Sequence, residues 1–518
     1  MRCTLIRPVY RVAGYDEGTQ ECLGLGYVGG MLRRHGHEVH VVDAEIEKLS
    51  DDQVLERVAG TDPELVGMSL MSEDGLESAI HLAKKLRYAL PKAHLTMGGN
   101  LASFAPDWVF RMCPHLDTVL RFEGEKPLLE LATCLQSGRD YTSIAGLCQL
   151  EAGRLHMNAP AVPADDLDSL PFPLRDTLPL TLEQGLMPPL ATSRGCQGKC
   201  TFCAVHRFNL DPDRPWRFRS SKNIADEIDR LVSDYGIEQV NFVDDDFIGN
   251  RKLGQPRARD LAAELKRRRL NVGFSLQCRA EWIDHDTFRP LKDAGLQMVF
   301  FGIEAVDQST RRAFKKGQSR DLVLRTLALL KELDVYTHVG FIMFNPWTTL
   351  ENVRESVEFL HDIGHLNIHT ITNFLQLSPG TPLLEPLVSE GVAYREPDGC
   401  YRYQFADPRV ASIKAVFDRV IWPHFPRWYE SLMAKWSILS KLMQSKSPRH
   451  DLCQHTLDRF DDVVYEVAVR TLDALEEDPQ LDLFALVREL RDWCRKQLED
   501  VPELPPSPYR RQPLLCAE

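Results

Sequence analysis

Short apolar runs alternate with helix-like stretches in two separate regions of this 518-residue chain. In residues 1–140 the runs CTLIRPV, HEVHVVD and LVGMSLMS are separated by helical patterns such as GLESAIHLAKKLRYAL. The alternation restarts near Thr181 and continues to about residue 390. Strand–helix alternation predicts parallel sheets with helices packed on their faces. The chain is therefore expected to be an α/β protein with two successive parallel sheets.

A proline- and aspartate-rich connection, APAVPADDLDSLPFPLRD, separates the two regions. We expect a Rossmann-like domain at residues 1–140 and a linker at residues 141–180. Residues 181–390 contain about six strand–helix units, enough for a partial (β/α)6 barrel but short of the eight of a closed one. Residues 391–518 have a helical, aromatic-rich pattern and predict a helical C-terminal domain. A chain of this length needs more than one core.

Charge and hydropathy exclude several classes of protein. The formal net charge is −13, which argues against a binder of nucleic-acid backbones. No run of about 18 apolar residues occurs, so no membrane span is expected. The N-terminus lacks the apolar core of a secretory signal, and the 13 scattered cysteines then predict reduced thiols. We therefore expect a cytoplasmic protein that contacts neither nucleic acid nor membrane.

Four potential metal ligands fall in the stretch SRGCQGKCTFCAVH: Cys196, Cys200, Cys203 and His206. A disulfide cluster is disfavoured by the compartment and by the odd number of cysteines. A structural zinc site remains open, although such sites usually draw their ligands from two separated pairs. An iron–sulfur cluster is the third interpretation, and three thiolates would leave one iron open to a small molecule. Gly195 and Gly198 would let the loop wrap closely around a bulky cluster.

The spacing Cys-x3-Cys-x2-Cys, with Phe202 just before the last cysteine, resembles the radical S-adenosylmethionine superfamily. The segments VDDDF, FGIEAVDQST and QLSPGTPL are similar to the ends of that family's second, fourth and sixth strands. The segments LGLGYVGGMLRRHGHEVHVVDAE, VGMSLMS, MGGN and RFEGEKPLLEL are similar to the cobalamin-binding domain that precedes the barrel in one branch. The resemblance implies a Rossmann-like cobalamin-binding domain followed by a radical barrel.

The resemblance also implies a set of ligands and a partner. Cys196, Cys200 and Cys203 would hold a [4Fe–4S] cluster whose open iron binds S-adenosylmethionine. One electron from the cluster would cleave a C–S bond, and the 5′-deoxyadenosyl radical would abstract a substrate hydrogen. The electron donor is expected to be flavodoxin- or ferredoxin-like, and His206 is expected not to be a ligand. The residues expected to contact S-adenosylmethionine are Phe202, Asp244, Asp245, Gln277, Arg279 and Glu304. For the aspartates, a purely structural capping role is the open alternative.

Cobalamin is expected at the carboxyl edge of the first sheet, where ligands of parallel sheets bind. The residues expected to line it are Gly24, Ser69, Ser72, Gly98, Gly99 and Glu125. Gly24, Gly26 and Gly29 also fit a dinucleotide fingerprint with Asp43 downstream. That fingerprint needs its glycines directly after the first strand, whereas about fifteen residues intervene here. A domain of this type that does not use cobalamin remains an alternative.

These features predict a cobalamin-dependent radical C-methyltransferase that acts on an unactivated carbon in natural-product biosynthesis. Two alternatives of the same class remain open: dehydration or rearrangement of an aminoglycoside-like substrate, and transfer of a 3-amino-3-carboxypropyl group. A metal-stabilised scaffold is the non-enzymatic alternative. The glycine-rich turn common after the family's fifth strand reads MFNPWTT here, so substrate contacts cannot be carried over from the family.

Overall fold

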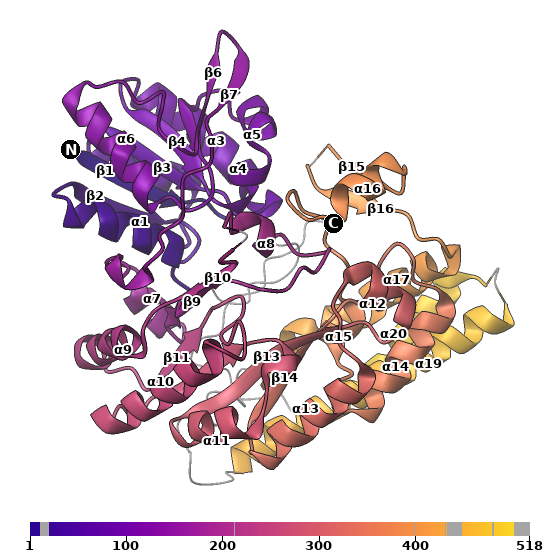
Figure 1. The fold of residues 1–518 in the computed structure, drawn as a ribbon. Coiled ribbons are helices and arrows are strands. Elements are labelled where there is room, and N and C mark those ends of the chain that lie inside the picture. The colour runs from indigo at the N-terminus through magenta and orange to yellow at the C-terminus, as the bar shows by residue number, and fades with distance from the viewer. Residues whose placement is uncertain are drawn as a thin grey trace.

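The computed structural model describes residues 1–10, 20–211, 213–397, 399–429, 431–432, 448–478 and 481–501. Figure 1 shows two sheets, one in the N-terminal part and one in the middle of the chain, with C-terminal helices beside the second. The model confirms an α/β fold with a helical C-terminal region. Within the ranges given, no helix is long and apolar enough to cross a membrane.

The first sheet has the strand order β2-β1-β3-β4-β5-β6-β7, and its first five members are parallel. These five are β1 (Arg2–Arg7), β2 (Glu38–Asp43), β3 (Leu65–Ser69), β4 (His94–Gly98) and β5 (Thr118–Leu120). Helices α1 (Leu23–Arg34) and α6 (Glu125–Ser137) contribute to the core on one face. The other face is covered by α2 (Asp51–Gly60), α3 (Leu76–Ala89), α4 (Asn100–Phe104) and α5 (Pro106–Met112). Burial on both faces explains the continuous apolar runs of the sequence.

Two further strands lie within the segment that we predicted as a linker. β6 (Leu147–Glu151) and β7 (Arg154–Met157) form a hairpin, and β6 pairs antiparallel with β5. The pairing buries Leu147 and Cys148 and covers the edge that β5 would otherwise expose. The predicted boundary at residue 140 therefore does not coincide with the end of the first sheet.

The rest of the linker packs on α1 and explains the glycine fingerprint. A Cβ atom on Gly26 would lie 2.9 Å from the carbonyl oxygen of Leu174, and one on Gly30 would lie 2.9 Å from that of Phe172. These glycines therefore allow two backbone segments to approach closely. The fingerprint reflects helix–linker packing, and residues 11–19 of the preceding loop lie outside the described residues.

The second sheet is parallel, with the order β14-β13-β12-β11-β8. Its strands are β8 (Pro189–Leu190), β11 (Gln239–Phe242), β12 (Gly273–Gln277), β13 (Leu296–Glu304) and β14 (Tyr336–Phe341). A short antiparallel pair, β9 (Ser193–Gly195) and β10 (Trp216–Phe218), lies between β8 and β11 in the chain. The connecting helices are α7 (Leu178–Glu183), α8 (Val205–Phe208), α9 (Ser221–Tyr235), α10 (Gly254–Arg268), α11 (His285–Asp293), α12 (Gln308–Phe314), α13 (Arg320–Glu332) and α14 (Leu350–Asp362).

The sixth of the predicted strand–helix units should begin with a strand over residues 369–377, HTITNFLQL, and here the structure differs. Residues 368–372 form helix α15 (Ile368–Thr372), and only Phe374 pairs, through one parallel bridge with Phe344. A capping box explains the helix, because Thr370 N–H donates to Asn367 Oδ1 and Asn367 N–H donates to Thr370 Oγ1, each at 3.0 Å. The partial barrel thus has a five-stranded sheet and a single bridge in the sixth position.

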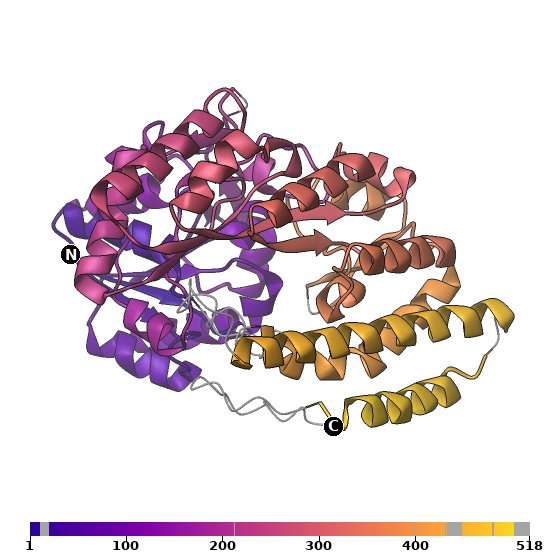
Figure 2. The ribbon, with the colours of Figure 1, turned by 90° about the horizontal axis from the view of Figure 1, so that it is seen from below.

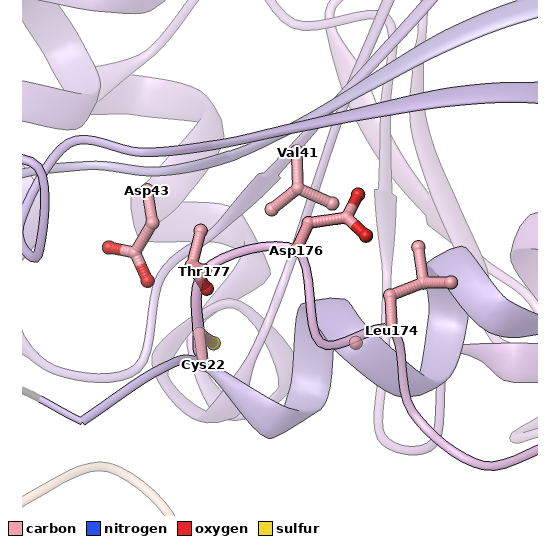
Figure 3. A pocket seen from close by; sticks show the side chains of 7 residues that line it. Cys22, Val41, Asp43, Leu174, Asp176 and Thr177 are labelled. Atoms are coloured by element: carbon pink, nitrogen blue, oxygen red, sulfur yellow. The ribbon is translucent and has the colours of Figure 1, made fainter. Parts of the chain in front are cut away.

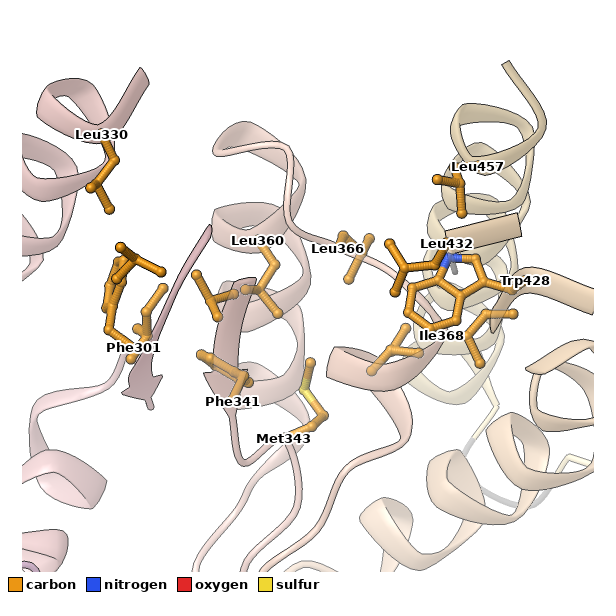
Figure 4. Packing of buried hydrophobic residues seen from close by; sticks show 14 of the residues in the cluster. Phe301, Leu330, Phe341, Met343, Leu360, Leu366, Ile368, Trp428, Leu432 and Leu457 are labelled. Atoms are coloured by element: carbon orange, nitrogen blue, oxygen red, sulfur yellow. The ribbon is translucent and has the colours of Figure 1, made fainter. Parts of the chain in front are cut away.

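The C-terminal region begins with α16 (Leu384–Ser389) and a hairpin, β15 (Ala393–Arg395) and β16 (Tyr401–Tyr403), and then becomes helical. Its later helices are α17 (Pro408–Val420), α19 (Pro448–Glu477) and α20 (Leu483–Leu498). Figure 2 shows α19 and α20, in yellow, outside the strand and helix layers of the second sheet. Side chains of these helices share one apolar core with the barrel, and Figure 4 shows Trp428, Leu432 and Leu457 near Leu366 and Ile368.

Candidate active site

The three predicted cluster ligands lie between β9 and β10, in a segment of residues 196–211 that we term the cysteine loop. Cys200 is buried, and Cys196 and Cys203 are half-buried. Gly195, the last residue of β9, has a φ of 89°, and a Cβ atom there would collide with the carbonyl oxygen of Pro215. The entry to the loop therefore requires glycine.

Two of the loop sulfurs accept hydrogen bonds. Gly198 N–H donates to Cys196 Sγ at 3.2 Å, and Arg279 Nη1 donates to Cys200 Sγ at 3.4 Å. Burial raises the pKa of the Cys196 thiol to about 12 and that of Cys203 to about 11, so a thiolate at either position needs a cationic partner. Hydrogen-bond donors to cysteine sulfur are typical of iron–sulfur sites, so the three thiols fit the predicted cluster.

The zinc interpretation of the same loop is not supported by the geometry. No three His, Cys, Asp or Glu side chains among the described residues converge on a position that one metal ion can occupy. His206 lies in the short helix α8, and its Nδ1 atom is buried without a hydrogen-bond partner. The four side chains therefore do not form a Cys₃His site in this structure.

The two predicted aspartates after β11 have different surroundings. Asp244 is buried and accepts hydrogen bonds from Thr192 N–H at 2.7 Å, Thr192 Oγ1 at 2.9 Å and Ser193 Oγ at 2.8 Å. Its carboxylate thus joins the end of β11 to the start of β9, which is a structural role other than the capping role left open above. Asp245 is exposed and accepts a hydrogen bond from Gly195 N–H at 3.2 Å, so it retains acceptor capacity for a ligand.

Gln277, the last residue of β12, and Arg279, just after the strand, also bind other groups of the protein. The side-chain amide of Gln277 donates to the backbone carbonyl of Asp244. Arg279 donates to Glu281 Oε1 at 2.5 Å and to the carbonyl oxygen of Lys316 at 2.9 Å, besides its bond to Cys200. The guanidinium is therefore fixed next to the cysteine loop, and its predicted contact with S-adenosylmethionine stays a prediction.

Glu304 ends β13 in a left-handed backbone conformation, with a φ of 68°. Its carboxylate pairs with Lys316 Nζ at 3.1 Å, and the two side chains are 13% and 9% exposed. Burial would lower the pKa of the Lys316 ammonium, but Glu304 and Cys200 together raise it above its usual value. Strained non-glycine residues cluster at functional sites, and the contact of Glu304 with S-adenosylmethionine stays a prediction.

Lys316 was not predicted from the sequence. It follows α12 in the stretch FKKGQ, where two adjacent lysines precede a glycine. Lys315 is exposed and Lys316 is buried, and no pattern in the sequence separates the two. Phe202, in contrast, was predicted, and its ring packs edge-on against Phe314 at a centroid distance of 4.9 Å.

At the carboxyl edge of the first sheet, the structure brings together the predicted residues of β3 and β4. Ser69 and Gly98 are direct partners in the sheet register. Gly99 has a φ of 103°, and a Cβ atom there would lie 2.5 Å from the carbonyl oxygen of Leu70, so this turn also requires glycine. Ser72 donates to Asp74 Oδ2 at 3.2 Å. These residues are small, as the prediction of a cobalamin site at this edge of the sheet requires, and their contact with a ligand stays a prediction.

The other two predicted cobalamin residues lie on helices. Gly24 is in the first turn of α1. Glu125 is the first residue of α6, and its Oε1 atom accepts a hydrogen bond from Arg194 Nη2 at 2.6 Å. The carboxylate of Glu125 therefore already contacts the second half of the molecule, through the strand that leads into the cysteine loop.

Figure 3 shows a small pocket between α1, β2 and the linker, lined by Cys22, Val41, Asp43, Leu174, Asp176 and Thr177. Asp43 is buried, lies 3.6 Å from Arg7 Nη1 and accepts a hydrogen bond from Ile46 N–H at 3.2 Å. Because its carboxylate is turned toward the protein and Leu174 covers α1, this region does not present a dinucleotide site.

Two known families match this chain, one in each of the two regions that contain the predicted cofactor sites. Residues 190–360 match the radical SAM superfamily, and residues 11–132 match the B12 binding domain. The first match contains the cysteine loop, and the second contains the carboxyl edge of the first sheet. An uncharacterized methyltransferase of Pyrococcus horikoshii is 28% identical over 375 residues, which are 71% of this chain and 79% of that protein.

Solved structures share the fold over most of the chain. OxsB, a cobalamin-dependent S-adenosylmethionine radical enzyme with aqua-cobalamin and S-adenosylmethionine bound, aligns with a TM-score of 0.78 and 17% identity. The alignment covers 96% of this chain and 80% of OxsB. TsrM, a radical S-adenosylmethionine methyltransferase from Kitasatospora setae with cobalamin and a [4Fe–4S] cluster bound, aligns with a TM-score of 0.63 and 20% identity over 76% of each chain.

Proposed function

Because this chain belongs to the cobalamin-binding branch of the radical S-adenosylmethionine superfamily, we propose that it transfers a methyl group to an unactivated carbon of a small molecule in natural-product biosynthesis. The enzyme uses a [4Fe–4S] cluster, S-adenosylmethionine and cobalamin. When bound, the cluster and S-adenosylmethionine supply a hydrogen-abstracting radical, and cobalamin supplies the methyl group.

The observation that best supports this proposal is a contact between the strand that enters the cysteine loop and the predicted cobalamin-binding edge of the first sheet. Arg194, two residues before Cys196, donates to Glu125 at the carboxyl edge of the first sheet at 2.6 Å. Hydrogen abstraction and methyl donation at one carbon require that both cofactors reach the same substrate. A chain in which the cysteine loop adjoins the carboxyl edge of the first sheet meets this requirement.

Several residues of the barrel have proposed roles toward S-adenosylmethionine. Cys196, Cys200 and Cys203 would hold the cluster. The carboxylates of Asp245 and Glu304 would accept hydrogen bonds from the ammonium or the ribose hydroxyls. The protein's part is to orient these groups and to keep water from the radical. We further propose a flavodoxin- or ferredoxin-like electron donor and a cytoplasmic location.

A second function has support in the comparison with OxsB, which covers 96% of this chain and is described as a radical enzyme rather than a methyltransferase. In this alternative the chain keeps hydrogen abstraction and rearranges or dehydrates its substrate without methyl transfer. Transfer of a 3-amino-3-carboxypropyl group, by cleavage of a different C–S bond, is the third outcome that an experiment must separate.

The test is anaerobic purification and reconstitution of the full chain, followed by absorption spectra with and without hydroxocobalamin. We expect a brown protein that binds cobalamin. With S-adenosylmethionine and a strong reductant, it should form both 5′-deoxyadenosine and S-adenosylhomocysteine. 5′-Deoxyadenosine without S-adenosylhomocysteine would favour the rearrangement, and methylthioadenosine would favour aminocarboxypropyl transfer.

A cluster-free variant provides the control. Changing Cys196, Cys200 and Cys203 together to alanine should abolish the brown colour and the formation of 5′-deoxyadenosine. Cobalamin binding should persist, because none of these residues belongs to the first sheet. Retained cleavage of S-adenosylmethionine in this variant would overturn the cluster assignment.

A further inference from the structure

The cysteine loop is tied to the first sheet by ion pairs at both of its ends. Arg194, in β9, lies 3.3 Å from Glu123 Oε2 through its Nη1 atom. Arg217, in β10, pairs with the other oxygen of the same carboxylate. Glu123 follows β5 and precedes α6, so one side chain of the first sheet binds the strand that enters the loop and the strand that leaves it.

This ion cluster is largely buried, and most of its polar atoms have partners; the Nε atom of Arg217 is buried without one. The side chain of Arg217 is 3% exposed and that of Glu123 is 14% exposed. Arg217 also donates to Asn209 Oδ1, within the loop, at 2.9 Å and to the carbonyl oxygen of Ala164 at 2.6 Å. Burial would raise the pKa of Glu123, but the two arginines hold it below its usual value. Because a buried charge is costly without its partner, the contact resists separation.

An aromatic contact joins the middle of the loop to the same turn of the first sheet. Phe208, in α8, packs edge-on against Phe122 at a centroid distance of 5.6 Å. Phe104, in α4, lies 6.2 Å from Phe208 and 5.7 Å from Phe122, so three rings from the two halves of the molecule form one cluster. Edge-on pairs of this kind add to the energy of apolar burial.

The backbone at Phe122 is strained, and the contacts of Phe122 and Glu123 with the cysteine loop explain why. Phe122 has a φ of 67°, and its N–H donates to Ser103 Oγ at 2.7 Å. Successive side chains of an extended strand point to opposite faces. Here the ring of Phe122 and the carboxylate of Glu123 both contact the segment from β9 to β10, which requires a departure from extended geometry. Such strain persists where the surroundings over-determine the backbone.

We propose that Phe122, Glu123, Arg194, Phe208 and Arg217 form an interdomain clamp, a positioning device that fixes the cysteine loop against the carboxyl edge of the first sheet. In the enzyme this clamp sets the separation between the iron–sulfur cluster and the corrin. The identity of those two cofactors rests on the proposed function. The attachment of the loop to the sheet rests only on the contacts above, and none of the five residues is assigned to the reacting groups.

The chain offers a matched control at another contact between its two halves. Glu21, just before α1, pairs with Arg175 of the linker, and Arg175 Nη2 also lies 2.7 Å from Glu227 Oε1 in α9. The side chains of Glu21 and Glu227 are both 3% exposed. Glu21→Gln therefore removes one buried carboxylate charge between the halves, as Glu123→Gln does, but none of its contacts involves the cysteine loop.

The first measurement is hydrogen–deuterium exchange of the full chain, without added cofactors. Glu123→Gln should make exchange in residues 196–211 about tenfold faster, the size expected for loss of a charge-assisted hydrogen bond. Glu21→Gln should leave that segment unchanged. Phe208→Leu, which keeps apolar volume but loses the ring contact, provides a second test if Glu123→Gln does not fold. Equal exchange of the segment in all variants would overturn the proposal.

The second measurement is the distance distribution between reduced cluster and cob(II)alamin, by pulsed electron paramagnetic resonance of the reconstituted protein. The distribution should be narrow in the wild type and in Glu21→Gln, and broad in Glu123→Gln. If Glu123→Gln speeds exchange in the loop but leaves the distance distribution unchanged, the clamp does not set the distance between the cluster and the corrin, and that part of the proposal is overturned. A chain that binds no cobalamin would give no dipolar signal in any variant, which would overturn the proposed function while the exchange data still decide the attachment of the loop.

Discussion

Each of the two sheets ends one strand region in a bulky residue with a left-handed backbone: Phe122 after β5 and Glu304 at the end of β13. Their φ angles are 67° and 68°. This conformation costs a non-glycine residue about 1–2 kcal/mol. The ring of Phe122 packs outward against the cysteine loop, whereas the carboxylate of Glu304 pairs with Lys316 inside the barrel. The same backbone conformation thus supports a contact between two domains at Phe122, and it positions a buried charge at Glu304.

The comparison separates the energy of the side chain from the strain of the backbone. At Phe122 the compensating energy is apolar burial, which tolerates small shifts. At Glu304 it is a buried ion pair, which leaves an uncompensated charge when either partner is removed. The losses of unfolding free energy caused by replacing these residues or their partners should therefore differ in size between the two turns. The contribution of backbone strain should be the same at both.

The largest effect is expected from Lys316→Met. The variant leaves the carboxylate of Glu304 buried without its ammonium partner, which costs about 3–5 kcal/mol of unfolding free energy. The measurement is anaerobic urea denaturation of the cofactor-free chain. Lys315→Met is the control, because this neighbouring lysine is exposed and should change stability little. Equal midpoints for the two variants would show that the Glu304–Lys316 pair does not stabilise the barrel turn.

A smaller loss is expected from Phe122→Ala. The ring is 8% exposed, and truncating a buried phenylalanine costs about 3 kcal/mol. The loss should appear as a lower thermal midpoint of the cofactor-free chain. Phe484, which is 75% exposed, supplies the control, and Phe484→Ala should be close to neutral. A neutral Phe122→Ala would mean that the aromatic contact contributes no stability across the two domains.

The strain itself can be measured by comparing glycine with alanine at each turn. Phe122→Gly and Glu304→Gly should each be about 1 kcal/mol more stable than the corresponding alanine variant, because glycine adopts positive φ without penalty. At Val299, inside β13, the order should reverse, because glycine weakens an extended strand. Alanine variants as stable as the glycine variants would show that the two turns relax without strain.

The same contrast explains what the sequence could predict. The spacing of Cys196, Cys200 and Cys203 is a local pattern, and it identified the loop without any knowledge of packing. The apolar runs likewise identified five strands of the first sheet and the five parallel strands of the second, but they also predicted a sixth strand where residues 368–372 form a helix. The hairpin β6–β7 escaped detection because its outer strand is polar and largely exposed, so that it has no alternating burial pattern.

The interactions that join distant segments could not be predicted in this way. Arg217, Lys316 and Glu123 are ordinary charged residues in the sequence, and only the fold reveals which of them are buried and paired. Asp244 shows the opposite case, because a carboxylate at a strand end suggested a ligand contact, whereas its hydrogen bonds in the fold go to Thr192 and Ser193. Its contact with S-adenosylmethionine stays a prediction. Residue type and strand position therefore identify candidates, and burial decides their roles.

The smallest predicted effect compares two histidines, one in each sheet: His94, which is buried, and His338, which is half-buried. His94 in β4 contacts Thr118 Oγ1 at 2.9 Å, and burial lowers its pKa to about 4. His338 in β14 lies 5.6 Å from the ring of His369, and burial, together with His369 and His365, lowers its pKa to about 3. Both imidazoles are therefore neutral in the folded chain at pH 6, whereas the unfolded chain binds protons below its pKa of about 6.5.

A depressed pKa in the folded state makes stability fall as pH falls through the unfolded value. Each histidine should lower the unfolding free energy by at most about 0.7 kcal/mol between pH 7 and pH 6. His94→Gln and His338→Gln should each remove that share of the pH dependence, measured as the difference in urea midpoint between the two pH values. His156→Gln, at an exposed position of β7, should keep it. An unchanged slope in His338→Gln would mean that this imidazole binds the same fraction of a proton in the folded and in the unfolded chain between pH 6 and pH 7, so that its environment in the barrel does not shift its pKa.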